Sequence, residues 1–492
     1  MTKDKEKKQT ALLYATVFLS GAMIMIFELT GSRILAPYFG SGMDSWTTLI
    51  GTILAFLSLG YYLGGKLADR EPKITTIGLL LAAAALTITV VDYLRDPILI
   101  SLFRLQAPLI VSVITAGILL FALPSTLLGM IQPYILKLSI KNIKSVGEIG
   151  GLISTLSTAG GIFGTFLGGF YVIPLLGTNL TLFLLVLNLL ALSLAYRGRI
   201  KVKLLIGLTS VLIFGVKLTS PPLLNAVADV DTRYSRVLVK NILYEGEPAH
   251  ALTFEPFGLQ STVYLEKPDE LAGQYLEFFE YATNFHPNPN HVVMVGGGAF
   301  VYPEHYAREN PEDLVSVFEV DEKLLPIAEE YLNYEPQANV KIYFQDGRYG
   351  LQELNRTVDI VILDAFSGLS SIPIHLTTQE YLGQLKQAGN SQTVVVANLI
   401  GQIVPGQTGF LESYLATFRE EFASVKVFQV RPETNLQERQ NFIIIAQDEE
   451  LELYGDKNLE FSKQEIAIDT AGVRLLTDDW APVHYFNRRF FN

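Results

Sequence analysis

The sequence contains no cysteine, and this absence limits its chemistry before any motif is considered. It excludes disulfide bonds, thiolate nucleophiles and metal sites built on cysteine. Acidic side chains are scarce in residues 1–220, which carry 9 Asp and Glu against 18 Lys and Arg. Residues 221–492 reverse the balance, with 40 acidic and 19 basic side chains. The two regions have net charges of +9 and −21, which indicates that they lie in different surroundings.

The acidic region also narrows the choice of partner. Its negative charge would repel the phosphates of a nucleic acid, so we expect no nucleic acid as partner. The same charge suits a small cationic ligand. The sequence shows no internal repeat and no low-complexity stretch.

Seven apolar segments in the first 220 residues are long enough, or nearly so, to cross a lipid bilayer. They are residues 11–28, 46–66, 74–92, 108–136, 149–175, 178–196 and 203–219. We therefore expect a multi-pass helical domain in the cell membrane, with the lipid bilayer as its partner. The first segment lacks a cleavage site of the A-x-A type close behind it and reads as an anchor.

The fifth segment carries glycines at intervals of four, Gly160, Gly164 and Gly168. Such a stripe lets a neighbouring helix approach closely, and we favour this packing role over a substrate path. The fragment 64–70 (GGKLADR) is similar to a loop of major-facilitator transporters, between their second and third helices. That similarity favours a transporter-like scaffold.

Lys and Arg predict the orientation of these helices. If the N-terminus is cytoplasmic, the segments on its side hold fourteen Lys and Arg, whereas the opposite loops hold only Arg33, Arg95 and Arg104. This is the asymmetry of the positive-inside rule. Seven crossings then place the soluble region outside the cytoplasm. A seventh segment that lies on the membrane surface leaves that region in the cytoplasm, and the sequence leaves both arrangements open.

The second half reads as a soluble α/β region. Residues 220–233, with a double proline, read as a linker, and residues 234–265 contain short β-like runs that predict a small antiparallel sheet. Residues 269–283 read as a helix. From residue 291, β-branched apolar runs alternate with helical patterns, which predicts a mainly parallel, doubly wound Rossmann-like sheet. The predicted divisions are a transmembrane domain (1–220), a linker and small β domain (221–285), a nucleoside-binding domain (286–450) and a C-terminal tail (451–492).

Ligands of open α/β sheets bind at the carboxyl ends of the strands. Glycines there let a ligand approach the backbone, and an acid about 20 residues further on suits a ribose diol. A carboxylate after the third strand can accept from an adenine amino group, and one after the fourth can meet a reacting amine. Four consecutive strand ends carry such groups: Gly296, Gly297 and Gly298, then Glu319, then Asp346 and Gly347, and finally Asp364. Together they predict a nucleoside pocket.

The motifs VVMVGGG, FEVDEKLLPIAEEYL, FQDGR and VDIVILDAFS resemble the nucleotide-binding core of the aminopropyltransferases, the spermidine synthase family. The resemblance extends over about residues 230–450 and includes the preceding small sheet. The segments FELTGSRILAPYFGSGMDSW and LGYYLGGKLADR resemble the membrane half of bacterial proteins that fuse such a domain to helices.

The resemblance implies S-adenosylmethionine or its decarboxylated form as cosubstrate, no covalently bound cofactor and no metal. It implies a small-molecule amine such as putrescine as the acceptor, and a homodimer formed through the soluble domains. By resemblance, the three glycines line the methionine-derived tail of the cosubstrate, Glu319 holds its ribose, and Asp346 with the adjacent Gly347 holds its adenine. The resemblance also implies that Gln260 contacts the nucleoside or the amine, and that Asp364 deprotonates or orients the amine.

Two positions depart from the family pattern. Ala299 stands where the family has an aspartate that grips the amino end of the decarboxylated donor, and Ser367 replaces the family's second acid. The aspartate lost at Ala299 favours an alternative, a methyltransferase that uses intact S-adenosylmethionine. A further alternative is not an enzyme: a transporter, or a sensor whose soluble domain binds a nucleoside or polyamine.

Three further features are interpreted from their positions. His291 precedes the first strand of the parallel sheet and reads as structural, whereas His375 follows the Asp364 loop and borders the predicted pocket. The acids Asp478 and Asp479, beside Trp480, read as part of a docked C-terminal segment.

Overall fold

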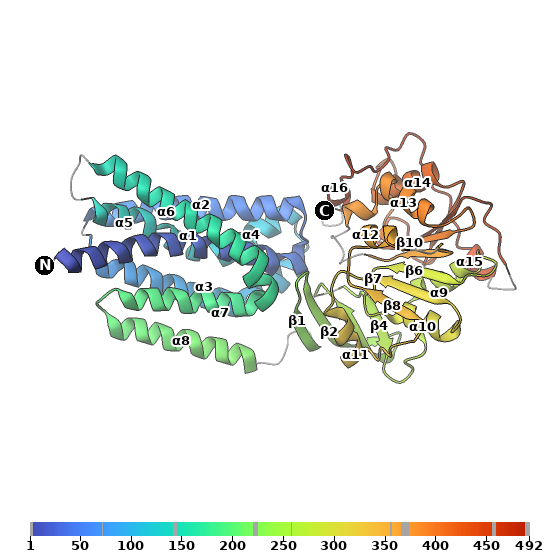
Figure 1. Ribbon diagram of the computed structural model, residues 1–492, viewed down its shortest axis with the longest axis horizontal. Coiled ribbons are helices and arrows are strands. Elements are labelled where there is room, and N and C mark those ends of the chain that lie inside the picture. Colours follow the sequence, from blue (N-terminus) through green and yellow to red (C-terminus); the bar gives the residue numbers. More distant parts are fainter. Residues whose placement is uncertain are drawn as a thin grey trace. The chain divides into compact units, whose positions relative to one another are not determined.

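A computed structural model describes residues 3–70, 72–140, 145–219, 225–256, 258–354, 357–365, 373–454 and 459–487. The chain forms two compact units, which we describe separately (Figure 1). The helical unit comprises Met1–Pro221 with Asp231–Ser235, and the α/β unit comprises Pro222–Val230 with Arg236–Asn492. The finer division at residues 285 and 450 stays a prediction.

The helical unit is a bundle of long apolar helices. α1 packs along α6, α2 along α4, and α3 along both α7 and α8 (Figure 1). The elements are α1 (Lys3–Phe39), α2 (Met43–Arg70), α3 (Ile74–Arg104), α4 (Leu109–Gly129), α5 (Ile131–Ser139), α6 (Val146–Leu167), the π-helical turn η2 (Gly168–Val172), α7 (Ile173–Ala195) and α8 (Ile200–Thr219).

Five helical segments among the described residues are long and apolar enough to cross a membrane: Asp4–Phe39, Met43–Arg70, Ile74–Arg104, Leu109–Ser139 and Val146–Ala195. The last has 50 residues, about 75 Å of helix, which is more than twice the hydrocarbon thickness of a bilayer. Its helical geometry breaks at Gly177 (φ 72°, ψ −179°), so it contains the fifth and sixth predicted segments. The seventh predicted segment forms α8, which is not one of the five.

The glycine stripe of α6 packs against α1, as predicted. A Cβ atom on Gly160 would overlap the carbonyl oxygen of Phe18, and one on Gly164 would overlap that of Ala22. Gly168 lies against Ile26, where a Cβ would be 3.0 Å from the side chain. Only glycine permits this distance between two helix backbones.

Charged side chains of α3 are buried inside the bundle, and the sequence analysis placed one of them wrongly. Arg95, assigned to a loop, lies within α3 and is only 3% exposed, because the helix continues to Arg104. Its Nη2 donates to Asn179 Oδ1 at 2.6 Å, and the Lys217 ammonium lies 2.6 Å from Asp92 Oδ1. Ionisable groups inside a bundle cost free energy unless they are paired, which these contacts achieve.

The α/β unit begins with a five-stranded sheet in the order β1-β2-β3-β4-β5. Its strands are β1 (Ala226–Asp231), β2 (Arg236–Tyr244), β3 (Glu247–Thr253), β4 (Ser261–Tyr264) and β5 (Leu271–Ala272), with antiparallel pairing from β2 to β5. The predicted small antiparallel sheet is confirmed.

Two sequence boundaries in this region were wrong. The predicted linker contains β1, whose alternating sequence AVADVD buries every second side chain at its start. The predicted helix 269–283 begins only at α9 (Gln274–Thr283), because Leu271 and Ala272 pair with β4. Gly273 (φ 138°) provides the backbone turn between strand and helix.

The second sheet has seven strands in the order β11-β12-β10-β9-β6-β7-β8. The five from β10 to β8 are parallel, and β12 pairs antiparallel with β10 and β11, so the predicted mainly parallel sheet is confirmed. The strands are β6 (His291–Val295), β7 (Leu314–Phe318), β8 (Val340–Tyr343), β9 (Ile360–Leu363), β10 (Val394–Gly401), β11 (Ser424–Gln429) and β12 (Gln440–Gln447).

Both faces of this sheet are covered, which explains its continuous apolar strands. Along β6, Val292 and Met294 join one buried cluster, and Val293 and Val295 join another. The first cluster includes side chains of α9, α10 (Val301–Glu309) and α11 (Leu324–Tyr331). The second includes those of α12 (Gly347–Gln352), α13 (Gln379–Ala388) and α14 (Phe410–Glu421). Three short helices complete the unit: η4 (Ile374–Leu376), α15 (Leu459–Ser462) and α16 (Val483–Asn487).

Candidate functional site

The glycine loop after β6 meets the acid after β7, as the sequence pattern predicted. Glu319 Oε2 accepts hydrogen bonds from the backbone N–H of Gly297 at 2.9 Å and of Gly298 at 3.4 Å, and Oε1 accepts from Asp321 N–H at 2.9 Å. Burial raises the pKa of the Glu319 carboxyl, while these backbone donors oppose the rise. The loop and the carboxylate therefore form one polar surface at the ends of two adjacent strands.

Gly296 and Asp364 lie against each other at the ends of β6 and β9. Gly296 has φ 96°, and a Cβ there would lie 2.5 Å from the carbonyl oxygen of Asp364. The Asp364 N–H donates to Val295 O at 2.9 Å, which continues the pairing of the two strands. Glycine is thus required at 296 by both the backbone conformation and the close approach.

The carboxyl group of Asp364 is held by a chain of two amides that the sequence analysis missed. Asn398 Nδ2 of β10 donates to Asp364 Oδ1 at 2.8 Å, and Asn441 Nδ2 of β12 donates to Asn398 Oδ1 at 2.9 Å. Burial raises the pKa of Asp364 from 3.8 to about 7, and the bond from Asn398 opposes this rise. The available signal was a single Asn inside the apolar run VVVANLIG.

Gln260 and Tyr275 form another side of the site. The Tyr275 hydroxyl donates to the backbone carbonyl of Gln260 at 3.1 Å. Burial, followed by the charge of Asp364, raises the pKa of Tyr275 above its ordinary value. Ser261 Oγ accepts from the N–H of Ala299 at 3.2 Å, which ties this segment to the glycine loop.

Asp346, the predicted adenine acceptor, has partners for both oxygens. It caps α12, accepting from Arg348 N–H at 2.9 Å on Oδ1, while Oδ2 lies 2.7 Å from His375 Nε2. The hydrogen bond and charge of His375 hold the pKa of Asp346 below its usual range. Gly347 follows at the first position of α12, where a Cβ would overlap the side chain of Val295.

The C-terminal segment is anchored beside this pair. Arg348 Nη1 and Nη2 donate to the two carboxylate oxygens of Asp478, at 2.8 and 2.7 Å, and Thr378 Oγ1 donates to Asp478 Oδ1 at 2.7 Å. The prediction that this C-terminal segment is docked is therefore confirmed. His291 is also structural, because its ring nitrogens bond Thr357 O and Ser316 Oγ and the residue is buried.

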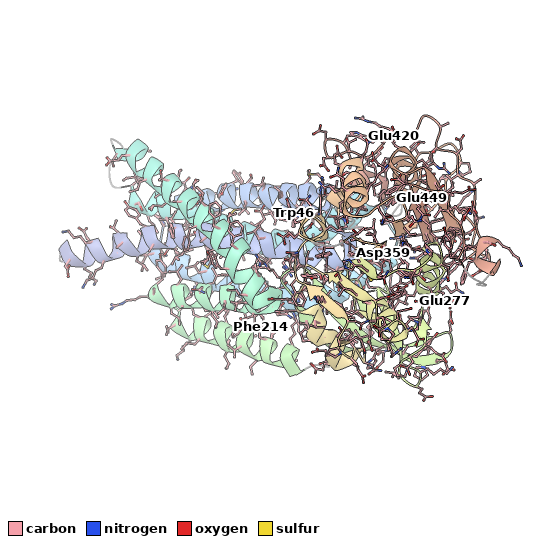
Figure 2. All side chains as sticks on the ribbon, turned by 45° about the vertical axis from the view of Figure 1, so that its right-hand side comes forward. Trp46, Phe214, Glu277, Asp359, Glu420 and Glu449 are labelled. Atoms are coloured by element: carbon pink, nitrogen blue, oxygen red, sulfur yellow. The ribbon has the colours of Figure 1, made fainter. Side chains whose placement is uncertain are left out.

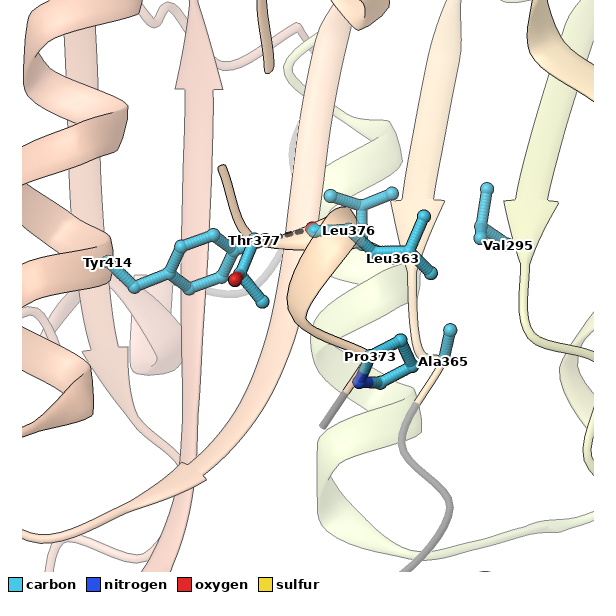
Figure 3. A pocket seen from close by; sticks show the side chains of 7 residues that line it. All are labelled: Val295, Leu363, Ala365, Pro373, Leu376, Thr377 and Tyr414. Atoms are coloured by element: carbon cyan, nitrogen blue, oxygen red, sulfur yellow. Dashed lines mark hydrogen bonds between the residues drawn. The ribbon is translucent and has the colours of Figure 1, made fainter. Parts of the chain in front are cut away.

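An apolar pocket opens beside Asp364 at the carboxyl ends of β6 and β9 (Figure 3). Tyr414 of α14 closes one side, with its hydroxyl 3.4 Å from the carbonyl oxygen of Leu376. Its walls are Val295, Leu363, Ala365, Pro373, Leu376, Thr377 and Tyr414. The pocket therefore lies next to Asp364, which directly follows β9.

Two positions depart from the family pattern, Ala299 and Ser367. Ala299 is only 1% exposed and packs within the core, so its position contributes no charge to the site. Ser367 lies outside the described residues. Among the described residues, no group of three or more His, Asp or Glu side chains could hold a metal ion.

No family model matches the chain. Among solved structures, a probable spermidine synthase from Corynebacterium glutamicum is 20% identical, with a TM-score of 0.44, covering 53% of this chain and 98% of that one. The spermidine synthase of Thermotoga maritima is 17% identical, with a TM-score of 0.39, covering 50% of this chain and 86% of that one.

Curated relatives match at higher identity over shorter stretches. The polyamine aminopropyltransferase of Vibrio vulnificus is 29% identical over 153 residues, which cover 30% of this chain and 49% of that protein. A probable polyamine aminopropyl transferase of Bifidobacterium longum is 24% identical over 284 residues, covering 53% and 61%. The spermidine synthase of Schizosaccharomyces pombe is 30% identical over 141 residues, covering 26% and 46%. The chain thus spans about half to three fifths of these relatives. Part of the chain is thus similar in sequence to polyamine aminopropyltransferases and spermidine synthases.

Proposed function

We propose that this protein is a membrane-anchored transferase that moves an aminopropyl group from decarboxylated S-adenosylmethionine to a small amine such as putrescine. One observation carries the proposal: Asp364, with a pKa of about 7, lies at the strand edge that also holds the glycine loop and Glu319. A carboxyl group with this pKa can accept a proton near neutral pH.

The donor would occupy the edge formed by β6, β7 and β9. Its charged tail would pass the N–H groups and small surface of the Gly296–Gly298 loop, and its ribose hydroxyls would bond Glu319. The adenine would lie with its amino group toward Asp346. Gln260 and Tyr275 would border the amine near Asp364.

The reaction requires an uncharged amine nitrogen behind a carbon bonded to the donor's sulfonium. Asp364 would take a proton from the ammonium group, and the freed nitrogen pair would attack that carbon. A C–N bond forms as the C–S bond breaks, and its electron pair leaves with sulfur as a neutral thioether. The amides of Asn398 and Asn441 would orient the carboxylate for this transfer.

The helical unit would hold the protein in the bilayer. Its outward-facing side chains are large and apolar, with Leu123, Phe166 and Leu175 each more than half exposed. Such a surface is unfavourable in water and favourable against acyl chains.

A second candidate, a methyltransferase that uses intact S-adenosylmethionine, is favoured by Ala299. An aspartate there would repel the donor's own carboxylate, whereas the buried methyl group does not. Both candidates use the same nucleoside surface and differ in the group transferred.

The test incubates the purified full chain with each donor and candidate amines, and identifies the nucleoside product by mass spectrometry. Methylthioadenosine from the decarboxylated donor supports aminopropyl transfer. S-adenosylhomocysteine from the intact donor instead supports the methyltransferase. Binding of either donor without a product in any combination contradicts both and favours a sensor. Asp364→Asn is the inactive variant, and Glu420→Gln, which removes an exposed carboxylate from α14 (Figure 2), is its matched control.

A further inference from the structure

The position of α8 decides how many times the chain crosses the membrane. α8 has 20 residues, about 30 Å of helix, which is enough to span the hydrocarbon core. Its Lys203 and Lys217 are 14 residues apart, about 21 Å along the axis. A helix that lies on a membrane surface turns such lysines toward water. In α8 both turn the other way.

Lys203 is 1% exposed and reaches across to the end of α7. Its ammonium donates to the carbonyl oxygens of Ser193 at 2.7 Å and Tyr196 at 2.6 Å. Tyr196 directly follows α7, and the Ser193 oxygen also accepts from Tyr196 N–H at 3.2 Å, so the last carbonyls of the helix provide acceptors for the buried charge. One end of α8 is therefore anchored inside the bundle.

Lys217, near the other end of α8, is anchored in the same way. Its ammonium bonds Asp92 Oδ1 at 2.6 Å, the Asp92 carbonyl at 3.0 Å and Asn179 Oδ1 at 3.2 Å. Between the two lysines, Phe214 (labelled in Figure 2) packs edge-on against Phe183 of α7, with ring centroids 5.0 Å apart. α8 thus contacts the bundle along its whole length.

The contacts with α3 also give the direction of α8. Lys203 lies beside Gly78, where a Cβ would overlap its ammonium, and Lys217 bonds Asp92. Gly78 and Asp92 are 14 residues apart, the same interval as the two lysines. The two helices therefore run parallel and in register, and α8 lies along the part of α3 from Thr75 to Leu94.

The outer face of α8 is apolar. From Val202 to Val216, every residue classed as exposed is apolar: Val202, Leu204, Leu205, Leu208, Val211, Leu212, Gly215 and Val216. With both lysines turned inward, this face matches the acyl chains of a bilayer over the full length of the helix.

We infer that α8 crosses the membrane, so the α/β unit and its nucleoside site lie on the side opposite the N-terminus, outside the cytoplasm. The sequence assigns fourteen Lys and Arg to the segments on the N-terminal side, of which Lys203 is buried, and assigns Arg33, Arg104 and the inward-facing Arg95 and Lys217 to the other side. The fourteen are Lys3, Lys5, Lys7, Lys8, Lys66, Arg70, Lys73, Lys137, Lys141, Lys144, Arg197, Arg199, Lys201 and Lys203.

This inference goes beyond the proposed function and does not depend on it. A sulfonium nucleoside carries a permanent charge, and a polyamine is charged at neutral pH, so neither crosses a lipid bilayer unaided. The site would take its ligands from the external side. If those ligands are made in the cytoplasm, a membrane transport step must supply them.

The absence of cysteine allows a direct test in the full chain. Single cysteines replace three exposed residues: Glu148→Cys at the start of α6, on the basic side; Leu105→Cys between α3 and α4; and Glu449→Cys in the α/β unit. Intact and lysed spheroplasts are treated with a membrane-impermeant maleimide, and the unsubstituted chain is the blank.

We expect Leu105→Cys and Glu449→Cys to react in intact spheroplasts, and Glu148→Cys to react only after lysis. Reaction of Glu449→Cys only after lysis, with Leu105→Cys still reactive in intact spheroplasts, would show that α8 does not cross. Reaction of Glu148→Cys alone in intact spheroplasts would show that the bundle is inverted. Either result overturns the inference, and neither depends on enzymatic activity.

Discussion

The buried carboxyl group of Asp364 predicts that the wild-type site reduces the stability of the α/β unit at neutral and higher pH. The folded state raises the pKa of this group from 3.8 to about 7, mainly by burial. Between these pH values the folded chain holds a proton that the unfolded chain releases. Stability must therefore fall as pH rises through this window. Asp364→Asn removes the ionisation and should remove this dependence.

The magnitude follows from the pKa shift. One pKa unit corresponds to about 1.4 kcal/mol, so the ionised carboxylate costs the folded state up to about 4 kcal/mol at pH 8. Part of this cost is already present at pH 5. The free energy of unfolding of Asp364→Asn, relative to that of the wild type, should therefore grow by about 2–3 kcal/mol between pH 5 and pH 8. The substituted amide keeps a carbonyl oxygen that can accept from Asn398.

The assay is thermal unfolding of the detergent-solubilised full chain at pH 5 and pH 8, following the transition of the α/β unit. For a unit of this size, the expected gain in Tm is roughly 5–10 °C larger at pH 8 than at pH 5. Glu420→Gln, which removes an exposed charge, should show no such pH-dependent gain. Equal shifts at the two pH values, or a loss of stability at pH 8, would show that folding does not desolvate Asp364.

Three other predictions test neighbouring features. If the proposed transfer is detected, kcat/KM should rise with pH through about pH 7, as Asp364 loses its proton. Asn398→Ala should move this rise of kcat/KM to higher pH, because Asp364 loses the hydrogen-bond donor that favours its charged form. Gly164→Val should destabilise the detergent-solubilised bundle by about 1–3 kcal/mol. Gly151→Val should destabilise it less, because nothing lies within 4 Å of a Cβ at that position. Similar losses of stability in the two variants would contradict the packing role of the glycine stripe. Lys217→Met should destabilise the bundle by about 1–3 kcal/mol, because the buried Asp92 carboxylate loses its closer cationic partner and keeps only Arg95, 3.4 Å away. An unchanged unfolding transition for this variant would show that the pair is unimportant.

The sequence alone determined the features that depend on local pattern. The lengths of the apolar runs predicted the long helices, and β-branched runs alternating with helical patterns predicted the parallel sheet. In such a sheet the carboxyl ends of neighbouring strands meet at one edge, so the spacing of Gly296, Glu319, Asp346 and Asp364 along the chain was enough to bring them together. The family resemblance rested on these same residues.

Only the tertiary structure decided which side chains from distant elements meet these residues. Asn398 and Asn441 bond one another because β10 and β12 pair in one register, and no periodicity along either strand indicates that contact. The hydrogen bond of His375 with Asp346 joins η4 to the cap of α12, which are 29 residues apart in the sequence. The inward lysines of α8 were equally hidden, because composition fixes the number of charges on a helix and only its packing against neighbours fixes which way they face.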